Sequence, residues 1–255
     1  MAKLQDITEF LDSELQIDEI PDYPGAFNGL QLENAGEVSA VVAAVDASLP
    51  VIEKAVAAGA DLLIVHHGMF WHGTQMVTGA NYRKLKLAMD AGLAIYSSHI
   101  PLDVHPQWGN NALLAKAIGM SEAAPFFDWK GIQLGLKQDI GIPLERLRQE
   151  LSEAVGGDVH CCPGGDDAAG VVGLITGGAG SEVAAMAKQG INTFITGEGP
   201  HWSYPLAEEL GVNILYAGHY ATETFGVRKL VDVVGEKFMV HLAGEHGFVD
   251  HPTGL

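Results

Sequence analysis

The sequence predicts an α/β fold made from an internally duplicated unit, in which two related layers of mostly parallel, buried strands are flanked by helices. Two observations predict this fold class. Residues 38–71 align without a gap with residues 169–202, so that Gly59 matches Gly190 and Trp71 matches Trp202. Short, continuous apolar runs also alternate with helical stretches, and strands without polar alternation are typical of parallel sheets covered on both faces.

The elements follow in order from this pattern. Leu4, Ile7, Leu11 and Leu15 have helical spacing and predict an opening amphipathic helix, which the Pro- and Gly-containing loop PDYPGAFNGLQLE follows. The expected strands are VSAVVAAV, DLLIV, LAIYS, VVGLIT, TFIT and NILYA, and the expected helices between them are SLPVIEKAVAAG, NYRKLKLAMDAG, SEVAAMAKQG and PLAEELG. Glycines close these helices at positions that favour a left-handed backbone.

We expect three segments that together form one compact unit. Residues 1–120 are the first α/β repeat with its N-terminal helix, and residues 169–255 are the second repeat. Residues 121–168 lie between them and contain a strand-like run, GIQLGLKQDIGI, and a helix candidate, PLERLRQELSEAVG. This stretch is short for a domain of its own, so we interpret it as a connector at the edge of a sheet.

Composition excludes several classes of protein. The chain has 255 residues, of which 47% are hydrophobic and 18% charged, which excludes general disorder. Its formal charge of −18 makes nucleic acid an unlikely partner, because phosphate backbones bind clusters of Lys and Arg. There is no signal-peptide core and no apolar run of about 18 residues, so we expect a cytoplasmic protein without a membrane partner. Cys161 and Cys162 are expected to be reduced thiols in a loop.

Histidines and carboxylates follow the predicted strands. His66 and His67 come directly after DLLIV, His99 and then Asp103 follow LAIYS, and His219 and Glu223 follow NILYA. The two pairs of a histidine and an acid four residues later are expected at equivalent positions of the two repeats. Ligands gather beyond the carboxyl ends of strands in α/β sheets. Where the chain turns, the two adjacent histidines could each hold a different ion, and a carboxylate four residues after a histidine could bridge the two ions. Imidazole and carboxylate ligands together suit Zn²⁺, Fe²⁺, Mn²⁺, Co²⁺ or Ni²⁺ better than Ca²⁺ or Mg²⁺.

Other motifs carry less information. His72, His105 and His201 lie near these groups in sequence, and either an orienting role beside a metal or a solvated role fits them. No role is assigned to the C-terminal histidines His241, His246 and His251. There is no G-x-G-x-x-G phosphate loop, no P-loop lysine and no G-x-S-x-G nucleophile motif.

Six segments together resemble a known family. They are NGLQLE, LLIVHHGMFW, SSHIPLDVHPQWGNN, TGEGPHW, GHYATETFGV and the tail FVDHPTGL. In combination they are similar to the GTP cyclohydrolase 1 type 2-like family, the YbgI-like group of dinuclear-metal proteins. The resemblance covers nearly the whole chain and is to the short form, which lacks a large inserted domain between the halves.

The resemblance implies an assembly and a set of ligands. It implies a toroidal homohexamer, either a trimer of dimers or a dimer of trimers, with a two-metal centre facing the interior. Carried over by position, one ion would be held by His67 and Asp103 and the other by His66 and His219, with Glu223 bridging. His99 would lie beside them as an acid/base or supporting group, and Glu198, at the position in the second repeat that matches His67, would border the cavity.

Two functions from different classes remain open. In the first, the protein is a dinuclear metal-dependent hydrolase that acts on a small molecule, either by GTP cyclohydrolase-type ring opening or on a damaged nucleotide, through a hydroxide that bridges the metals. In the second, it is a non-catalytic hexameric scaffold or metallochaperone. An open ligand position favours the enzyme, and the absence of a clear purine-recognition motif favours the scaffold. The sequence determines neither the substrate nor the metal.

Overall fold

The computed structural model describes residues 1–73 and 75–250, and it divides into two compact units. Unit 1 contains Met1–Leu102 and, later in the chain, residues 226–250. Unit 2 is the continuous segment Asp103–Phe225. The repeat boundaries predicted at residues 120 and 168 come from sequence similarity rather than from compactness, and they stay a prediction.

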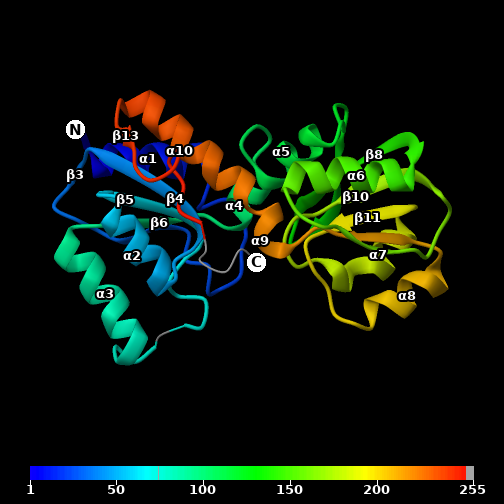
Figure 1. Cartoon of the computed structure of the whole chain (residues 1–255), viewed down its shortest axis with the longest axis horizontal. Helices are drawn as coiled ribbons and strands as arrows, with labels where there is room; N and C mark the ends of the chain where they lie inside the picture. Colours follow the sequence, from blue (N-terminus) through cyan, green and yellow to red (C-terminus); the bar gives the residue numbers. More distant parts are fainter. Residues whose placement is uncertain (74, 251–255) are drawn as a thin grey trace. The chain divides into compact units, whose positions relative to one another are not determined.

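Unit 1 contains a five-stranded sheet in the order β13-β4-β5-β6-β2 (Figure 1). Neighbouring strands from β13 to β6 are parallel, and β2 is antiparallel to β6. The strands are β2 (Gly29–Leu32), β4 (Ala40–Asp46), β5 (Leu62–His67), β6 (Ala94–Ser97) and β13 (His241–Leu242), and a separate pair joins β1 (Ala2–Lys3) to β3 (Glu37–Val38).

Helices cover both faces of this sheet. They are α1 (Leu4–Leu15), α2 (Leu49–Ala57), α3 (Gly79–Ala91) and α10 (Thr224–Phe238), and the short α4 (Ile100–Asp103) ends at the first residue of unit 2. Helices α2 and α3 pack on one face through a buried cluster that includes Ile52 and Ala88, while α1 and α10 lie on the other (Figure 1). The four apolar residues that predicted α1 are all buried in it, which confirms that helix.

Unit 2 contains a six-stranded sheet in the order β7-β8-β10-β11-β12-β9. Strands β10, β11 and β12 are parallel, whereas β7, β8 and β9 add antiparallel pairs. The strands are β7 (Ala124–Trp129), β8 (Ile132–Pro143), β9 (His160–Cys162), β10 (Ala168–Leu174), β11 (Thr193–Thr196) and β12 (Asn213–Tyr216). The stretch interpreted as a connector therefore supplies strands at both edges of this sheet.

Helices also cover both faces of the second sheet. They are α5 (Asn110–Ala117), α6 (Leu144–Val155), α7 (Val183–Lys188), α8 (Ser203–Leu210) and α9 (His219–Thr222), with a 3₁₀ turn at Gly180–Glu182. Leu114 of α5 and Leu147 of α6 belong to one buried cluster, and Met186 of α7 and Ala207 of α8 belong to another. Both clusters contain apolar side chains from the strands between them, so the unit has three layers.

The strand register confirms the duplicated α/β unit. In unit 1, Val41 of β4 pairs with Leu62 of β5; in unit 2, the residues 131 positions further along, Val172 and Thr193, pair in the same way. Each unit then adds a third parallel strand after a further helix, β6 or β12. The expected parallel strands are thus confirmed at the centre of each sheet, and the antiparallel strands lie outside them.

Three local predictions need correction. His66 and His67 are the last two residues of β5 and do not follow it. The cysteines are free, as expected, but they lie in strand β9 and not in a loop. The two histidines that follow the third strands are also displaced by one residue: His99 lies five positions after the first residue of β6, and His219 lies six after that of β12. The sequence similarity between the two repeats is too low after these strands to show this shift.

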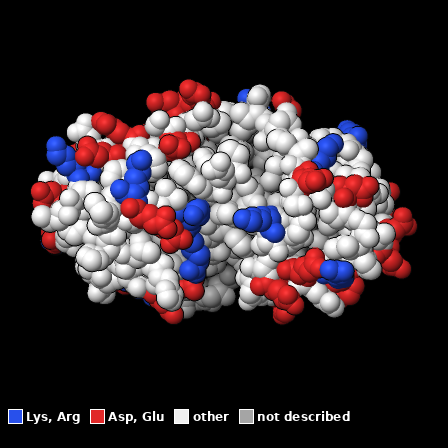
Figure 2. Space-filling model, turned by 90° about the horizontal axis from the view of Figure 1, so that it is seen from above, with Lys and Arg blue, Asp and Glu red and all other residues white. Residues whose placement is uncertain are grey.

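The face seen in Figure 2 does not concentrate the acidic residues in one patch. On the face seen in Figure 2, Asp and Glu side chains are scattered, and Lys and Arg occur among them. Among the described residues, no helix is both long enough and apolar enough to span a bilayer.

Candidate metal-binding groups

Unit 1 brings three predicted imidazoles together. His66 and His67 end β5, and His99 follows the neighbouring parallel strand β6, so both strands deliver their histidines at the same edge of the sheet. The centroid of the His66 ring lies 4.8 Å from that of His67 and 4.9 Å from that of His99. The centroids of the His67 and His99 rings are 5.6 Å apart. One nitrogen from each ring lies within 4.8 Å of the others, so the three groups could hold a metal ion.

The end of the β5–β6 pairing explains how adjacent residues share a site. Side chains of successive residues in a regular strand point to opposite faces. The pairing of β5 with β6 stops at Val65 and Ser97, whereas the pairing with β4 continues to His67. His66 and His67 therefore lie where one neighbouring strand has ended, and their rings approach each other at an interplanar angle of 48°.

Each of these imidazoles is oriented through its Nδ1 atom. His66 Nδ1 lies 2.9 Å from the carbonyl oxygen of Ser98, and His67 Nδ1 lies 2.9 Å from Asp46 Oδ1. His99 Nδ1 lies 2.8 Å from Asp22 Oδ1. Carbonyl and carboxylate oxygens accept hydrogen bonds, so Nδ1 carries the proton in each ring and Nε2 carries the lone pair of the neutral form. This is the arrangement that prepares histidines to bind metals.

Asp22 also holds the residue that follows His99. Its Oδ2 atom accepts a hydrogen bond of 3.0 Å from the backbone N–H of Ile100, and its side chain is 8% exposed. Burial is the largest influence on the pKa of Asp22 and raises it, but hydrogen bonds and charge from His99, with hydrogen bonds from Asn28 and Tyr23, outweigh burial and lower the pKa. Asp22 therefore stays a carboxylate and fixes the orientation of the His99 ring.

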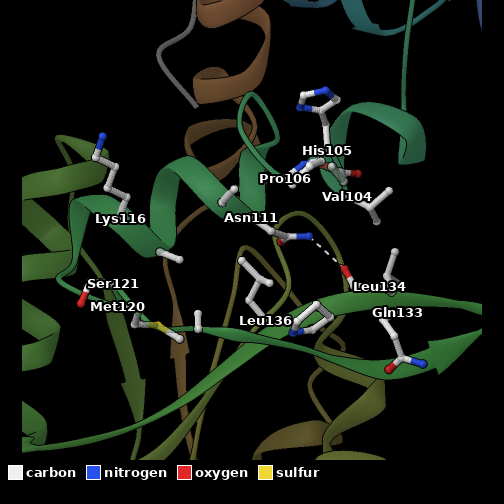
Figure 3. A pocket seen from close by; sticks show the side chains of 16 residues that line it. Val104, His105, Pro106, Asn111, Lys116, Met120, Ser121, Gln133, Leu134 and Leu136 are labelled. Carbon is white, nitrogen blue, oxygen red and sulfur yellow. Dashed lines mark hydrogen bonds between the residues drawn. The ribbon is translucent and has the colours of Figure 1, made fainter. Parts of the chain in front are cut away.

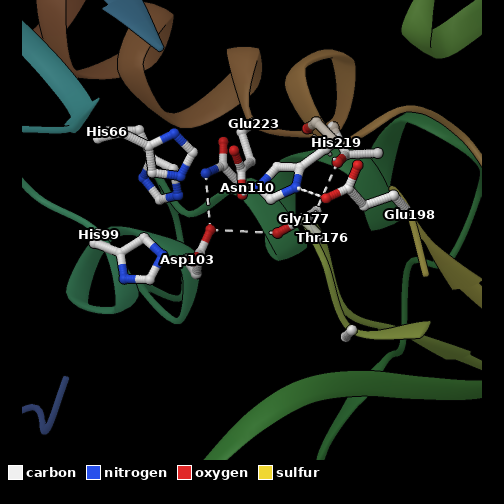
Figure 4. A network of polar contacts seen from close by, with 12 residues as sticks. His66, His99, Asp103, Asn110, Thr176, Gly177, Glu198, His219 and Glu223 are labelled. Atoms are coloured by element: carbon white, nitrogen blue, oxygen red, sulfur yellow. Dashed lines mark hydrogen bonds and ion pairs between the residues drawn. The ribbon is translucent and has the colours of Figure 1, made fainter. Parts of the chain in front are cut away.

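Unit 2 brings Asp103, His219 and Glu223 to the loop after β10. The buried Asp103 accepts hydrogen bonds at Oδ1 from Asn110 Nδ2 at 2.8 Å and from Thr176 Oγ1 at 3.3 Å (Figure 4). The next residue in that loop, Gly177, has φ of +73°, and a Cβ atom there would collide with the Glu223 carboxylate. Glycine is required here because the backbone passes so close to the carboxylate.

His219 lies between two carboxylates. Its Nε2 atom is 3.1 Å from Glu223 Oε1, and its Nδ1 atom is 2.9 Å from Glu198 Oε1 (Figure 4). Burial is the largest single influence on the pKa of His219 and lowers it, but hydrogen bonds and charge from Glu223 and Glu198 raise the pKa to about 9. With this raised pKa, the His219 ring carries a proton on both nitrogens at neutral pH.

The donor groups of each unit are of types that bind transition metals. Unit 1 offers three imidazoles with an oxygen acceptor at Nδ1, and unit 2 offers His219 with the buried carboxylates of Asp103 and Glu223. Mixed imidazole and carboxylate ligands are typical of Zn²⁺, Fe²⁺, Mn²⁺, Co²⁺ and Ni²⁺ sites.

A cavity in unit 2 includes one of the predicted groups. It has a volume of about 530 Å³ and lies between α5 and strands β7 and β8, with Asp103, Lys116, Met120 and Leu136 among its lining residues (Figure 3). Asn111 spans part of it by donating a hydrogen bond of 2.9 Å to the carbonyl oxygen of Leu134. The cavity is large enough for a small molecule.

The remaining histidines lie in other settings. His105 stacks on Trp108 with ring centroids 4.6 Å apart, and its Nδ1 atom accepts backbone hydrogen bonds from residues 107 and 108. His201 lies 5.9 Å from the Tyr204 ring, and His72 is exposed. His241 lies in β13 and His246 in an exposed turn, while His251 is outside the described residues.

Sequence reasoning missed three orienting groups. Asp46 ends β4 and pairs in register with His67 of β5, so an acid at the end of the preceding strand was the available signal. Thr176, which contacts Asp103, directly follows the apolar part of the VVGLIT run. No pattern marks Asp22, which lies in the loop before β2 and reaches His99 across 77 positions of sequence.

Comparison with known proteins agrees with this fold. A protein of Pyrococcus abyssi named GTP cyclohydrolase 1 type 2 homolog is 41% identical over 254 residues, covering 98% of this chain and 99% of the relative. A protein of the same name from Deinococcus radiodurans is 35% identical, covering 98% and 94%. The solved structure of protein ybgI, described as of unknown function, has a TM-score of 0.88 and 32% identity, covering 99% of this chain and 100% of that one.

The coverage is nearly complete in both directions, which confirms the short form without a large inserted domain. Residues 2–253 also match the sequence pattern of the Duf34/NIF3 (NGG1p interacting factor 3) family. The resemblance seen in the sequence is thereby confirmed over the whole fold, and the chain belongs to the Duf34/NIF3 family.

Proposed function

We propose that this protein is a metal-dependent hydrolase whose centre takes ligands from both units. His66 and His67 of unit 1, with Asp103, His219 and Glu223 of unit 2, are the proposed ligands of two divalent transition-metal ions. The observation that carries the proposal is the shared orientation of the histidines, because four imidazoles have Nδ1 on an oxygen acceptor and Nε2 on the opposite side of the ring. In sequence, Asp103 and Glu223 lie next to the two points where the chain passes from one unit to the other, at residues 102–103 and 225–226.

The bound ions would supply Lewis acidity and lower the pKa of a water molecule, which makes hydroxide available at neutral pH. The chain's own residues would handle protons and orientation. His99 is held by Asp22 with its Nε2 lone pair available, so we assign it the transfer of a proton to or from the substrate. Asp46 and Glu198 would orient the rings of His67 and His219.

We assign a nucleotide or a related heterocycle as the substrate class. The relatives from Pyrococcus abyssi and Deinococcus radiodurans carry the name GTP cyclohydrolase 1 type 2 homolog, and ring opening of a purine is a hydrolysis that a metal centre supports. With a formal charge of −18, the chain needs bound cations to attract an anionic substrate locally. A homohexameric assembly belongs to the same proposal, and the molar mass in solution tests it.

Metal analysis coupled to turnover tests the proposal. Protein purified without chelators should contain up to two divalent ions per chain, and GTP should be hydrolysed with added Mn²⁺, Fe²⁺ or Zn²⁺. Glu223→Ala should lose both ions, whereas Asp103→Ala should weaken mainly one. Glu209→Ala on α8 is a matched control, because it removes an exposed carboxylate of the same unit. Two ions retained by Glu223→Ala would contradict the bridging role, and full metal content without turnover of any nucleotide would favour the scaffold.

A further inference from the structure

Unit 1 exposes aromatic side chains beside its imidazole cluster. We define the aromatic platform as Tyr23, Phe27, Phe70 and Trp71. The side chains of Tyr23 and Phe27 are 49% and 57% exposed. The rings contact each other in two pairs: the centroids of Phe27 and Phe70 are 5.9 Å apart, and those of Tyr23 and Trp71 are 6.5 Å apart. Grouped aromatic exposure of this kind is typical of a surface that binds something.

The aromatic platform adjoins the imidazoles directly. The Trp71 ring lies 4.6 Å from the His99 ring at an interplanar angle of 86°, and 5.5 Å from the His67 ring at 74°. Tyr23 lies 6.1 Å from His99. A planar molecule that stacks on Tyr23 would therefore lie close to His99.

Trp71 also has a hydrogen-bond donor that the described residues leave unused. Its indole Nε1 atom is buried and has no acceptor within the part of the chain that the structure describes. Buried N–H groups nearly always have a partner, and a group that lacks one requires an explanation. A bound molecule with an acceptor at this point would provide that partner.

Two loops are fastened together to form the aromatic platform. The side-chain amide of Gln31 accepts a hydrogen bond of 2.7 Å from the backbone N–H of Met69 and donates to the carbonyl oxygens of Ala26 and Phe27, at 3.1 and 2.9 Å. Gly68 is needed because a Cβ atom would collide with this amide. Phe27 has φ of +43°, a conformation that non-glycine residues rarely adopt and that often marks functional sites.

We propose that the aromatic platform binds a planar heteroaromatic ring, stacked on Tyr23, with an acceptor at the edge of the ring that receives the Trp71 indole N–H. The bound ring would lie against His99. The proposal deepens the proposed function by assigning residues to substrate recognition, and it rests on that function only for the reaction that follows binding. Binding itself needs no metal, so the two can fail separately.

Calorimetric titration of chelator-treated protein with guanosine tests the proposal. Guanosine has a planar ring with O6 and N7 acceptors and no phosphate, so charge contributes little to its affinity. We expect saturable binding. Tyr23→Ala should weaken it about tenfold through loss of stacking. Trp71→Phe keeps an aromatic ring without the N–H donor, and it should weaken binding about fivefold.

Matched controls are available elsewhere in the chain. Tyr82→Ala removes a tyrosine of α3 that is 50% exposed, and Trp202→Phe changes the tryptophan at the corresponding position of the second repeat, which is 51% exposed. Both should bind guanosine as the wild type does.

Three results would overturn the proposal. The wild type could fail to bind guanosine, Tyr23→Ala and Trp71→Phe could both bind it as tightly as the wild type, or the two control variants could weaken binding as much as Tyr23→Ala and Trp71→Phe do. A change in molar mass of Tyr23→Ala without loss of affinity would also overturn it, because the aromatic platform would then be a surface between copies of the chain. If guanosine binds but the protein holds no metal, the proposed function fails and the aromatic platform stands.

Discussion

The protonated state of His219 should make the stability of the metal-free protein depend on pH. Its pKa is raised from 6.5 to about 9 in the folded protein. The proton therefore binds more tightly to the folded state than to the unfolded state, and it contributes stability that is complete below pH 6.5. This contribution is lost as the pH rises through about 9.

The change in unfolding free energy can be worked out from the pKa shift of His219 and from the exposure of the His219 and Glu198 side chains. One pKa unit corresponds to about 1.4 kcal/mol, so the shift sets a ceiling of roughly 3.4 kcal/mol. The His219 and Glu198 side chains are 34% and 66% exposed, and solvent screening reduces such interactions. We therefore expect about 1–2 kcal/mol of unfolding free energy to be lost between pH 6.5 and pH 9.5.

Urea denaturation of chelator-treated protein at these two pH values measures the loss. The informative quantity is the difference between the wild type and His219→Gln, because other groups titrate equally in both proteins. His201→Gln removes an exposed imidazole of the same unit, and it should follow the wild type. Parallel pH dependence of the wild type and His219→Gln would refute the assigned interaction with the two carboxylates.

Three further predictions concern other parts of the structure. Gly177→Ala should lower the unfolding free energy by about 1–3 kcal/mol, because a Cβ atom meets the neighbouring carboxylate and φ is positive; unchanged stability in urea would contradict this. Asp46→Ala should weaken metal binding about tenfold or more by releasing His67, as measured by competition with a chelator, and an unchanged affinity would remove the orienting role of Asp46. Tyr96→Phe should lower the unfolding free energy by about 1 kcal/mol, because Asp12 loses a partly buried hydrogen bond; a neutral effect in thermal unfolding would contradict the contact.

Periodicity and repetition predicted the centre of each sheet. The apolar runs became β4, β5 and β6 and their counterparts β10, β11 and β12, because strands buried on both faces require apolar residues throughout. The antiparallel strands were harder to predict. Strand β7 is paired only along one edge by β8, and its sequence APFFDW has neither alternation nor sufficient length to identify it.

The histidines of the candidate site were predicted, but their support was only partly predicted. His66, His67 and His99 were expected at strand ends, and unit 1 brings them together. His99 is the residue before α4, whereas His219 is the first residue of α9, and an approximate match does not resolve this shift of one residue. Asp22 could not be predicted from spacing, because its contact with His99 depends on the path of an irregular loop.

The discontinuity of unit 1 has a consequence for synthesis on the ribosome. Unit 2 is a single insertion between residues 102 and 226, so it can fold while translation continues. Unit 1 cannot be completed at that stage, because α10 and the edge strand β13, which pairs with β4, are made last. The first hundred residues must therefore wait with an open sheet edge until the C-terminal segment emerges, and a nascent chain stopped at residue 225 should depend on chaperones to stay soluble.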